Sequence, residues 1–408
     1  MSEAVSLAHV ARPSELARTL PAEQHELHYA SNGQFAFCHE DLNWSRHRLQ
    51  SIEPALFLAR LASGKPVYSL EEWRQYVRDD IALLEAIKPD LVIGDFRLTL
   101  GVSARRVGIP YLAVCNAHWS PYRAPYRMSA PDLPISRFVG NALIDPIFRA
   151  VWPVASRLHI HAANTVRHEY GLPPYSTLQH LYCDGDYALY ADTPALIPTP
   201  SAPPSHQHIG PIVWSPKMGV PEWWDVACRN SPPPIYITFG STGQVDLLPT
   251  IVAACGAEGA ASIVATAGRS TFRHDPPQVY AAPFLPGSAA AAASRLVICN
   301  GGSATAHQAL TQGRPILGIC SNLDQVLTMD TIAAAGAGEY LRASEATPAR
   351  LRALLRKMLS TTSYAERARQ LQADFRIYDP RRLFPAAIER ALADDTLPGH
   401  PPATTGGA

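Results

Sequence analysis

Short apolar runs alternate with amphipathic runs in this chain, and the alternation occurs twice. In the first part, HELHYA, PDLVIGD and IPYLAVCN read as strands, while residues 70–87 and the run LGVSARRVG read as helices. Further along, IYITFG, ASIVATAG, RLVICN and RPILGIC are strand-like, and the runs between them are helix-like. Strands that alternate with helices predict βαβ units and parallel sheets. We therefore expect an α/β protein with two doubly wound, Rossmann-like domains.

A proline-rich stretch separates the two halves. The run TPALIPTPSAPPSHQHIGPIVWSPK, with NSPPP behind it, concentrates prolines that cannot continue a helix or an inner strand. We expect an amino-terminal domain over residues 1–200, a linker over 201–234 and a carboxy-terminal domain over 235–379. Doubly wound folds bind ligands at the carboxyl ends of their strands, so we expect the two domains to face each other across one cleft. The final run PGHPPATTGGA predicts a disordered tail, which we place at 395–408.

The composition places the chain among globular proteins and excludes several classes of function. Of its 408 residues, 47% are hydrophobic and 17% are charged, which allows large buried cores. Lys plus Arg number 35 and Asp plus Glu number 35, so no net charge attracts nucleic acid or an anionic membrane. We find no run of about 20 apolar residues and no signal-peptide pattern. We expect a soluble, cytoplasmic protein without a nucleic-acid partner or a transmembrane segment.

The segment RLVICNGGSATAHQALTQGRPILGIC carries the strongest local signal. The strand LVIC leads into Gly301 and Gly302, which allow a tight turn and a close approach to a ligand. A helix over 304–312 is expected to follow, with Ser303 or Thr305 supplying a hydroxyl at its start. The backbone amides and the dipole of a helix start favour an anion, most often a phosphate. The same spacing also fits an ordinary strand-turn-helix corner, because glycine pairs are common turn residues.

This segment resembles the nucleotide-sugar signature of bacterial family 1 glycosyltransferases of the GT-B fold. In that family the signature reads H-G-G-x-G-T, then E, then G-x-P, then D-Q. The chain keeps this spacing, and the matching residues are Asn300, Gly301, Gly302, Ser303, Ala304, Thr305, Gln308, Gly313, Pro315, Asp324 and Gln325. Upstream, Phe284 in FLPG stands at the family's W-x-P-Q, and Ser241 and Thr242 resemble its phosphate-contacting F-G-S/T. The resemblance covers most of residues 235–345 and is weaker over nearly all the rest.

The resemblance implies a donor site for a nucleoside-diphosphate sugar. Ser241 and Thr305 would donate hydroxyl hydrogen bonds to the diphosphate, and the amides at the helix start would complete its cradle. Phe284 would stack on the base. Asp324 and Gln325 would hydrogen-bond the sugar hydroxyls, a task that suits a carboxylate beside an amide. The alternative for Asp324 is the cap of the helix that follows it.

Three residues depart from the family pattern. Asn300 replaces a histidine that contacts phosphate, so a neutral amide stands where a ring can carry positive charge. Gln308 replaces the glutamate that grips the ribose hydroxyls, and Ala304 replaces a glycine and narrows the approach of the phosphate. These departures leave open whether the donor is a uridine or a thymidine diphosphate sugar.

Sugar transfer to an alcohol needs a base, because an alcohol is a poor nucleophile until its proton is being removed. The resemblance places this base at His9, in a loop before a helix that begins near Pro13. It places the partner at Asp95, after the strand PDLVIG, where the carboxylate would orient the ring and stabilise the imidazolium. Without the resemblance, His9 reads as a helix cap and Asp95 as the end of a strand.

The strand expected before His9 is missing or stunted. Family members begin with an apolar strand there, whereas this chain offers only MSEAVSL. We expect either a true start upstream of Met1, with about six more apolar residues to complete a strand, or a sheet without its central strand.

The acceptor pocket is expected after the strand YLAVCN. Trp119, Tyr122 and Tyr126 follow that strand and so belong to the ligand side of the sheet. Aromatic walls favour a flat or lipophilic acceptor, while the alternative is a loop packed on its own hydrophobic patch.

Neither a metal ion nor a cofactor is expected. Asp184 and Asp186, with a glycine between them, mimic the D-x-D metal motif of another glycosyltransferase fold, but they open the strand YALYAD and read as turn residues. The seven cysteines are scattered and never spaced as C-x-x-C, so they indicate neither a zinc site nor a disulfide framework. Helix amides and hydroxyls would instead meet the charge of the leaving diphosphate.

Taken together, the resemblance implies an inverting, metal-independent hexosyltransferase that uses a UDP-sugar or dTDP-sugar and a small, aromatic or lipophilic acceptor. A helix over 380–394 would cross back to the amino-terminal domain. Two alternatives stay open: an epimerase of the same fold that acts on the nucleotide sugar itself, and a non-catalytic partner protein of that fold.

Overall fold

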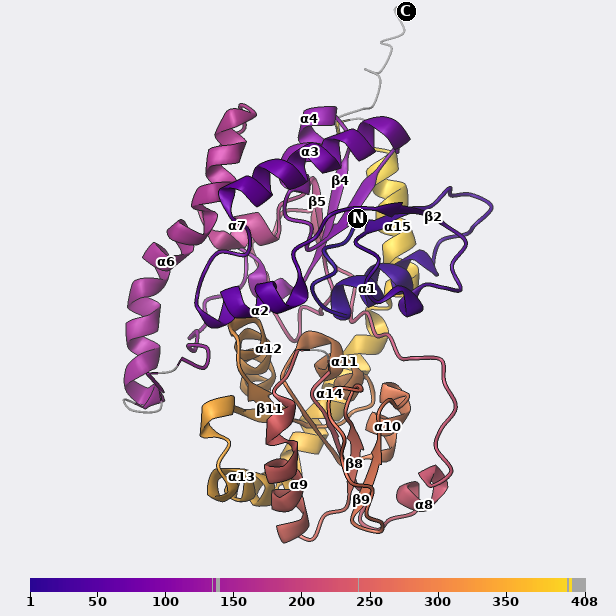
Figure 1. Ribbon diagram of the computed structural model, residues 1–408, viewed down its shortest axis with the longest axis vertical. Coiled ribbons are helices and arrows are strands. Elements are labelled where there is room, and N and C mark those ends of the chain that lie inside the picture. The colour runs from indigo at the N-terminus through magenta and orange to yellow at the C-terminus, as the bar shows by residue number, and fades with distance from the viewer. Residues whose placement is uncertain (134, 137–139, 241, 395, 398–408) are drawn as a thin grey trace, which may run out of the picture. The chain divides into compact units, whose positions relative to one another are not determined.

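The computed structural model describes residues 1–133, 135–136, 140–240, 242–394 and 396–397. The chain divides into two compact units, which are drawn in Figure 1. Unit 1 combines Met1–Ala124, Trp152–Ile212 and the described residues from Tyr378 onward, and unit 2 combines Pro125–Val151 and Val213–Ile377. Both units are built on parallel sheets with helices, so the α/β class predicted from the alternation is confirmed.

Unit 1 contains a four-stranded and a two-stranded parallel sheet. The larger sheet has the order β3 (Val92–Asp95), β4 (Tyr111–Cys115), β5 (Tyr187–Tyr190) and β6 (His206–His208), and the smaller pairs β1 (His28–Ser31) with β2 (Ser45–Arg48). Every residue of β4 and β5 is buried, as expected for inner strands of a parallel sheet that is covered on both faces.

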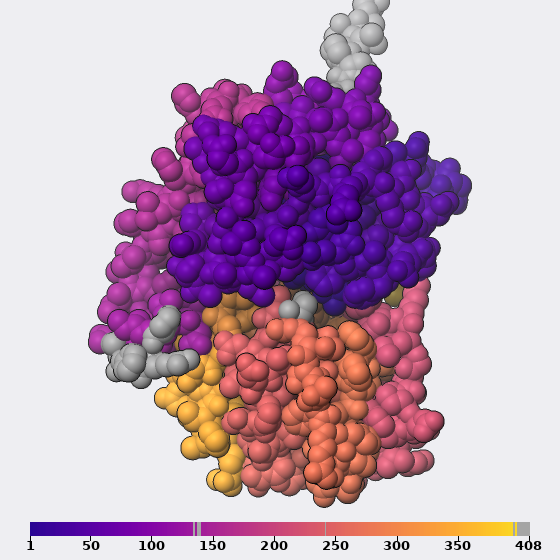
Figure 2. Space-filling model, viewed as in Figure 1, coloured from indigo at the N-terminus to yellow at the C-terminus, as the bar shows by residue number. Residues whose placement is uncertain are grey.

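Residues 1–3 stand where the first strand is expected, and they link the two sheets of unit 1. The amide of Ser2 donates to the carbonyl of Ala30 in β1 at 3.0 Å. The amide of Asp95 in β3 donates to the carbonyl of Met1 at 3.1 Å, and Ser2 pairs with Asp95 in parallel. Residues 1–3 therefore bridge β1 and β3 at the position expected for the first strand. In Figure 2 the indigo and violet residues at the start of the chain form one continuous surface.

The helices of unit 1 cover these sheets. They are α1 (Ala8–Ala17), α2 (Pro54–Ala62), α3 (Leu70–Ile87), α4 (Leu100–Val107), α7 (Leu178–Tyr182) and α15 (Pro380–Leu392), with short 3-10 turns at Ala36–Cys38 and Ala117–Trp119. The long helix α6 (Asn141–Glu169) has residues in both units. Helix α3 begins with a capping box, because the Ser69 amide donates to Glu72 at 2.7 Å and the Glu72 amide donates back at 3.3 Å. Phe384 and Ile388 of α15 pack in the core formed by β4 and β5.

Unit 2 has one six-stranded sheet. Its order is β12 (Gly338–Arg342), β11 (Ile316–Cys320), β10 (Leu296–Cys299), β7 (Ile235–Thr238), β8 (Ser262–Ala265) and β9 (Val279–Ala282). The strand order reverses between β7 and β10, which makes their carboxyl ends the switch point where doubly wound folds bind ligands. The helices are α8 (Trp224–Cys228), α9 (Leu248–Ala257), α10 (Gly287–Ala293), α11 (Ser303–Thr311), α12 (Leu323–Ala334), α13 (Pro348–Ser360) and α14 (Ser363–Ile377), with 3-10 turns at Val245–Leu247 and Ala343–Glu345.

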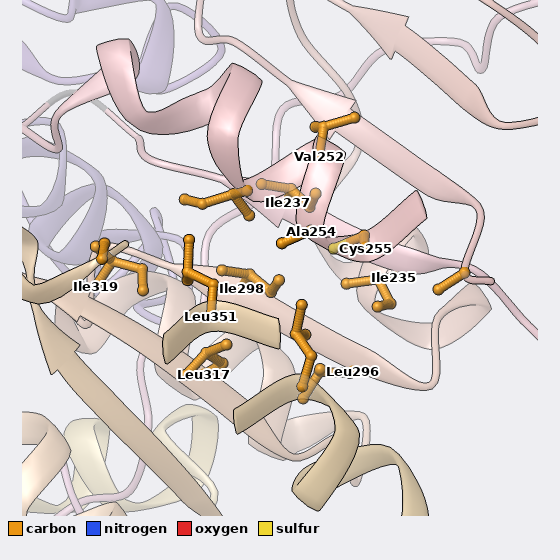
Figure 3. Close-up of a cluster of buried hydrophobic side chains, with 14 of the residues drawn as sticks. Ile235, Ile237, Val252, Ala254, Cys255, Leu296, Ile298, Leu317, Ile319 and Leu351 are labelled. Atoms are coloured by element: carbon orange, nitrogen blue, oxygen red, sulfur yellow. The ribbon is translucent and has the colours of Figure 1, made fainter. Parts of the chain in front are cut away.

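The core of unit 2 follows from the alternation of side chains along its strands. Alternate residues of β7, β10 and β11 point to one face, where they meet α9 and α13 (Figure 3). Ile237, Ile298 and Leu351 are fully buried there. A rigid, apolar layer thus supports the strand ends that form the switch point.

The unit boundaries differ from the expected domains. The segment 125–151 falls within the expected amino-terminal domain but packs in unit 2, where Arg342 binds Asp145 and donates to the carbonyl of Ala130 at 2.9 Å. The expected linker contains β6 and α8. Because β6 is an edge strand, prolines beside it remove no hydrogen bond from an inner ladder.

The ends of the chain differ in what the structure describes. Residues 395 and 398–408 of the expected tail lie outside the described residues, whereas Leu397 packs against the core of unit 1 and is not part of a disordered tail. In the described part of the chain, no helix is both long and apolar enough to cross a membrane.

Candidate active site

In unit 1, polar side chains gather where β3, β4 and β5 end. Asp95 is the last residue of β3, Asn116 directly follows β4, and Asp192 lies just beyond β5. His9 lies in the first turn of α1 rather than in a loop before a helix near Pro13, so that expectation is wrong. Pro13 lies inside this helix, and because proline has no backbone N–H, the carbonyl of His9 receives no hydrogen bond from residue 13.

The structure brings His9 and Asp95 together. Nδ1 of His9 lies 2.7 Å from Oδ1 of Asp95. Because a carboxylate only accepts, Nδ1 carries the proton of this hydrogen bond, and Nε2 of the neutral ring is left as the basic nitrogen. Phe96 stacks on the imidazole with ring centroids 4.7 Å apart. Its φ of 57° is a strained, left-handed conformation, which places the ring beside His9.

Arg12 joins this pair, and the sequence analysis missed it. Its Nε donates to Oδ2 of Asp95 at 2.9 Å and its Nη2 to Oδ1 at 2.7 Å. Its Nη1 donates to Oδ1 of Asn116 at 2.7 Å. Residues three apart share a helix face, so the spacing of His9 and Arg12 could have revealed the arrangement. It did not, because Pro13 indicated a later helix start.

Asp95 is only 1% exposed, yet it is held as a carboxylate. Burial by itself raises the pKa of Asp95, but the charge of Arg12 and the hydrogen bonds from His9 and Arg12 outweigh burial and bring the pKa below its ordinary value. An ionised carboxylate at this position can orient the ring of His9 and stabilise its imidazolium form.

An aromatic cluster extends from the stacked ring of Phe96. Phe57 and Tyr182 meet Phe96 edge-on, with centroids 5.9 and 5.6 Å away. Trp119 in turn meets Tyr182 edge-on at 4.6 Å. Trp119, which was expected in the acceptor pocket, therefore belongs to the same cluster as the ring stacked on His9.

The other two aromatic residues expected in that pocket are not in this cluster of rings. Tyr122 packs edge-on against His206 of β6 at 5.0 Å. Tyr126 belongs to unit 2 and is 38% exposed. The chain passes from unit 1 to unit 2 between Tyr122 and Tyr126, so their place in an acceptor pocket stays a prediction.

In unit 2, the glycine-rich segment lies at the switch point. Asn300, directly after β10, donates from Nδ2 to the hydroxyl of Thr242, in the loop after β7, at 3.0 Å. Its Oδ1 accepts from the amide of Gly302 at 3.2 Å. One amide side chain thus connects both loops of the position where this class of fold binds ligands.

The turn before α11 depends on Gly301. Its φ is 79°, and a Cβ there would lie 2.6 Å from Sγ of Cys320 and 2.8 Å from Cγ of Met329. Helix α11 begins at Ser303, one residue earlier than expected, and its N-cap is Gly302, which contributes no side-chain cap. The helix start therefore relies on its backbone amides, the groups that bind an anion at such a position.

Besides Thr242, three residues that carry a hydroxyl group were predicted at the donor site, and the structure describes two of them. Thr305 lies in the first turn of α11, with Ala304 exposed beside it, and neither Thr305 nor Ser303 is the N-cap. Ser241 lies outside the described residues.

Phe284 is 51% exposed in the loop after β9. The tip of its ring lies over Gly268, where an added Cβ would come within 3.3 Å. A half-exposed ring can serve as a stacking platform for a base.

Gln308 on α11 donates from Nε2 to the carbonyl of Trp214 at 2.5 Å. Its Oε1 lies over Gly287, where an added Cβ would come within 2.7 Å. A glutamate could not donate to that carbonyl, so the departure from the family pattern at this position has a structural reason.

Helix α12 begins with a capping box that the sequence analysis missed. The amide of Gln325 donates to Oδ1 of Asn322 at 3.0 Å, and Oε1 of Gln325 accepts from the amide of Ser321 at 2.8 Å. Gln325 is 2% exposed, so it has a structural role besides the predicted sugar contact. Asp324 lies in the first turn of α12 and is not its N-cap.

The two aspartates of the D-x-D-like motif are bound within the fold. Asp184 accepts hydrogen bonds from Arg105 at 2.8 and 2.7 Å and from the hydroxyl of Tyr175 at 2.5 Å. Asp186 accepts from the amide of Tyr111 at 2.8 Å. Among the described residues, no group of three His, Cys, Asp or Glu side chains is placed to hold a metal ion.

Comparisons with known proteins show what the chain is similar to. Residues 250–383 match the family model described as erythromycin biosynthesis protein CIII-like, C-terminal domain. The chain is 38% identical over 393 residues to the PGL/p-HBAD biosynthesis rhamnosyltransferase of Mycobacterium bovis (strain BCG / Pasteur 1173P2), and the alignment covers 96% of this chain and 86% of the relative.

Solved structures agree as well. Spinosyn rhamnosyltransferase SpnG, complexed with spinosyn aglycone, matches with a TM-score of 0.70 at 19% identity, covering 95% of this chain and 98% of that one. The same enzyme complexed with thymidine diphosphate matches with a TM-score of 0.67 at 19% identity, covering 94% and 97%. At these identities the structural likeness shows the fold, which is GT-B.

The assignment of an activity rests on the relative in sequence. Its identity and coverage are high enough to show that this protein is an enzyme that transfers a sugar from a nucleotide sugar to an acceptor. The chain belongs to the family 1 glycosyltransferases of the GT-B fold.

Proposed function

We propose that this glycosyltransferase acts with inversion and without a metal ion, and that it glycosylates a hydroxyl of a small aromatic or lipophilic acceptor. The observation that carries the proposal is the 2.7 Å contact between Nδ1 of His9 and Asp95. Removal of a proton from an alcohol needs a base in a fixed orientation. A buried carboxylate that binds one nitrogen of the imidazole fixes the ring, and the other nitrogen can then act as the base.

In the proposed reaction, Nε2 of His9 takes the proton of the acceptor hydroxyl. The hydroxyl oxygen attacks the anomeric carbon while the nucleoside diphosphate leaves from the opposite face. Asp95 stabilises the imidazolium that forms. Since a single displacement occurs at the anomeric carbon, the configuration inverts.

The donor would be held by the residues of the switch point in unit 2. The amides at the start of α11, with the hydroxyls of Thr242 and Thr305, would meet the charge of the diphosphate without a metal ion. The loop around Ser241 would contribute a further hydroxyl. Phe284 would stack on the base, and Asp324 would accept from a sugar hydroxyl beside Gln325.

Relatives and structural neighbours guide the choice of donor and acceptor. Because the relative is a rhamnosyltransferase and SpnG binds thymidine diphosphate, a dTDP-deoxyhexose is the first donor to test, with UDP-sugars next. The cluster of Phe96, Phe57, Tyr182 and Trp119 supports an acceptor with a flat, apolar part, because aromatic rings pack well on such groups.

The proposal is tested by measuring transfer from dTDP-rhamnose and UDP-sugars to a panel of phenolic and lipophilic alcohols. We expect His9→Ala to lower the transfer rate by about 10²- to 10⁴-fold, the usual contribution of a general base. Binding of the nucleoside diphosphate should stay unchanged in the same variant. His168→Ala is the matched control, since His168 is an exposed residue at the end of α6.

Two further readouts test the finer points. The anomeric configuration of the product, read by NMR coupling constants, should be opposite to that of the donor, and a chelator should leave the rate unchanged. Undiminished transfer by His9→Ala would refute the role of the base. Retention of configuration would refute the single displacement.

A further inference from the structure

We propose that Arg12 is a positioning residue for catalysis, whose guanidinium keeps the carboxylate of Asp95 ionised and fixed in the orientation that His9 needs. This inference rests on the proposed role of His9 as the base. It adds to the usual pair of histidine and aspartate a third member, which binds the carboxylate of Asp95 with two nitrogens and whose Nη2 also lies 3.0 Å from Nδ1 of His9.

The first step of the argument is geometric. Arg12 approaches Asp95 side-on with two nitrogens, at 2.9 Å to Oδ2 and 2.7 Å to Oδ1. A bidentate pair fixes the plane of a carboxylate, which a single hydrogen bond does not. The same Oδ1 also accepts from His9 at 2.7 Å. The plane that Arg12 sets is therefore the plane that orients the imidazole.

The second step is that Arg12 is itself held in place. Its third nitrogen, Nη1, donates to Oδ1 of Asn116 at 2.7 Å. The Nδ2 of Asn116 donates to Oδ2 of Asp192 at 3.1 Å, and Asp192 also accepts from the amide of Ala117 at 2.7 Å. These buried side chains follow the carboxyl ends of β3, β4 and β5, so the sheet itself positions the guanidinium.

The third step is electrostatic. The side chain of Arg12 is 9% exposed and that of Asp95 is 1% exposed, so water screens the pair weakly. Burial raises the pKa of Asp95, and the largest opposing influence is the charge of Arg12. Without that charge, burial would favour the protonated carboxyl group. A protonated Asp95 stabilises an imidazolium poorly.

Several other charged or titratable groups lie near Asp95. They are His9 and Arg12 from α1, the Met1 amino group, Tyr29 of β1, Tyr111 of β4 and Arg97 after β3, while Asp192 after β5 is linked to Arg12 through Asn116. Burial lowers the pKa of the Met1 amino group to about 6 and raises that of Tyr29 to about 12. Arg97 is bound by Glu3 and Asp80 at 2.8 and 2.9 Å. Among these groups, Arg12 is the cation that hydrogen-bonds the carboxylate of Asp95 directly.

The test compares Arg12→Gln, which removes the charge, with Arg12→Lys, which keeps it. In Arg12→Gln we expect the acidic limb of the kcat/KM profile to move up by about one pH unit or more, because Asp95 protonates more readily. The kcat at neutral pH should fall about tenfold or more through loss of orientation. Affinity for the nucleoside diphosphate should stay unchanged, since its proposed contacts lie in unit 2.

Arg12→Lys should return the acidic limb toward its wild-type position while kcat stays below wild type, because an ammonium restores charge but not the bidentate fit. Arg106→Gln, an exposed arginine of α4, is the control and should change neither readout. If Arg12→Gln does not fold, Asn116→Ala, which removes the acceptor of Nη1, should shift the limb in the same direction by a smaller amount.

The outcomes separate the two proposals. A folded Arg12→Gln enzyme with a wild-type acidic limb and kcat overturns the role of Arg12, and so does an unshifted Asn116→Ala where Arg12→Gln does not fold. If either of these results is found while His9→Ala loses transfer, the proposed role of His9 as the base still stands. Full transfer in His9→Ala would instead overturn the proposed function itself.

Discussion

Asn300 donates a hydrogen bond to the hydroxyl of Thr242 at 3.0 Å, across the point where the strand order of unit 2 reverses. The same side chain accepts from the amide of Gly302 at 3.2 Å. The family signature that this segment resembles has a histidine at this position. Here the amide fixes the two loops to each other, so it shapes the cradle without bringing positive charge to it.

Removal of this link should weaken nucleotide binding. In Asn300→Ala we expect the Kd of the nucleoside diphosphate to rise about tenfold, which corresponds to about 1.4 kcal/mol and to the loss of one or two hydrogen bonds. Calorimetric titration measures the change. Asn230→Ala is the control, because the side-chain amide of Asn230 donates to the local carbonyl of Ala227 at the end of α8. An unchanged Kd would show that the link does not shape the site.

A methyl group at Gly301 should disrupt the turn before α11. Gly301→Ala places a Cβ 2.6 Å from Cys320 and forces a side chain into a φ of 79°. We expect a loss of about 1–3 kcal/mol in the free energy of unfolding. Gly302→Ala is the matched control: its φ is −70°, and its Cβ would come no closer than 3.4 Å to Asn300. Equal denaturation midpoints for the two variants would contradict this explanation.

Phe284 should contribute to nucleotide affinity but little to stability. Because the residue is 51% exposed, Phe284→Ala should leave the melting temperature nearly unchanged. If the ring stacks on the base, binding of the nucleoside diphosphate should weaken by about 1–3 kcal/mol in free energy. Phe284→Tyr should retain binding. An inorganic pyrophosphate titration supplies the control, since that ligand has no base and should bind Phe284→Ala as it binds wild type.

Replacing Gln308 with the glutamate of the family signature should lower the stability of this protein. Gln308→Glu sets a carboxylate against the carbonyl of Trp214, with which Nε2 now makes a 2.5 Å hydrogen bond. We expect the free energy of unfolding to fall by about 1–3 kcal/mol, the cost of two acceptors left facing each other. Chemical denaturation measures it. Stability equal to wild type would show that the Trp214 contact is dispensable.

His206 should make unit 1 sensitive to mild acid. Burial lowers the pKa of His206 to about 4, and its Nδ1 lies 2.6 Å from the hydroxyl of Tyr190. The unfolded chain binds a proton there near its ordinary value of 6.5, whereas the folded chain does so only near 4. Stability therefore falls as the pH drops through this window, because the unfolded state binds more protons.

His206→Gln should reduce this sensitivity. The variant keeps a group that can hydrogen-bond Tyr190 but has nothing to titrate in the window. Its melting temperature should fall less between about pH 7 and about pH 5 than that of wild type. His168→Gln, on the exposed end of α6, should behave like wild type. Parallel curves for all three proteins would contradict the assignment to His206.

Much of the architecture was predictable from local patterns. The helix expected over 70–87 occurs as α3, Leu70–Ile87, and the strands around Asp95 and Asn300 lie where apolar runs indicated them. Glycine spacing also located the turn before α11. These features depend on residues only a few positions apart, so a sequence displays them directly.

Tertiary structure decided how distant residues combine. Arg12 and Asp95 are 83 positions apart, and Arg12 and Asn116 are 104 apart, so no local spacing links them. The transfer of segment 125–151 to unit 2 likewise depends on partners elsewhere in the chain, such as Arg342. The sequence by itself determined the α/β class, the strand-turn-helix corner and the family. The fold alone decided which charge stands beside the candidate base, because parallel strands bring the ends of distant segments to one edge of a sheet.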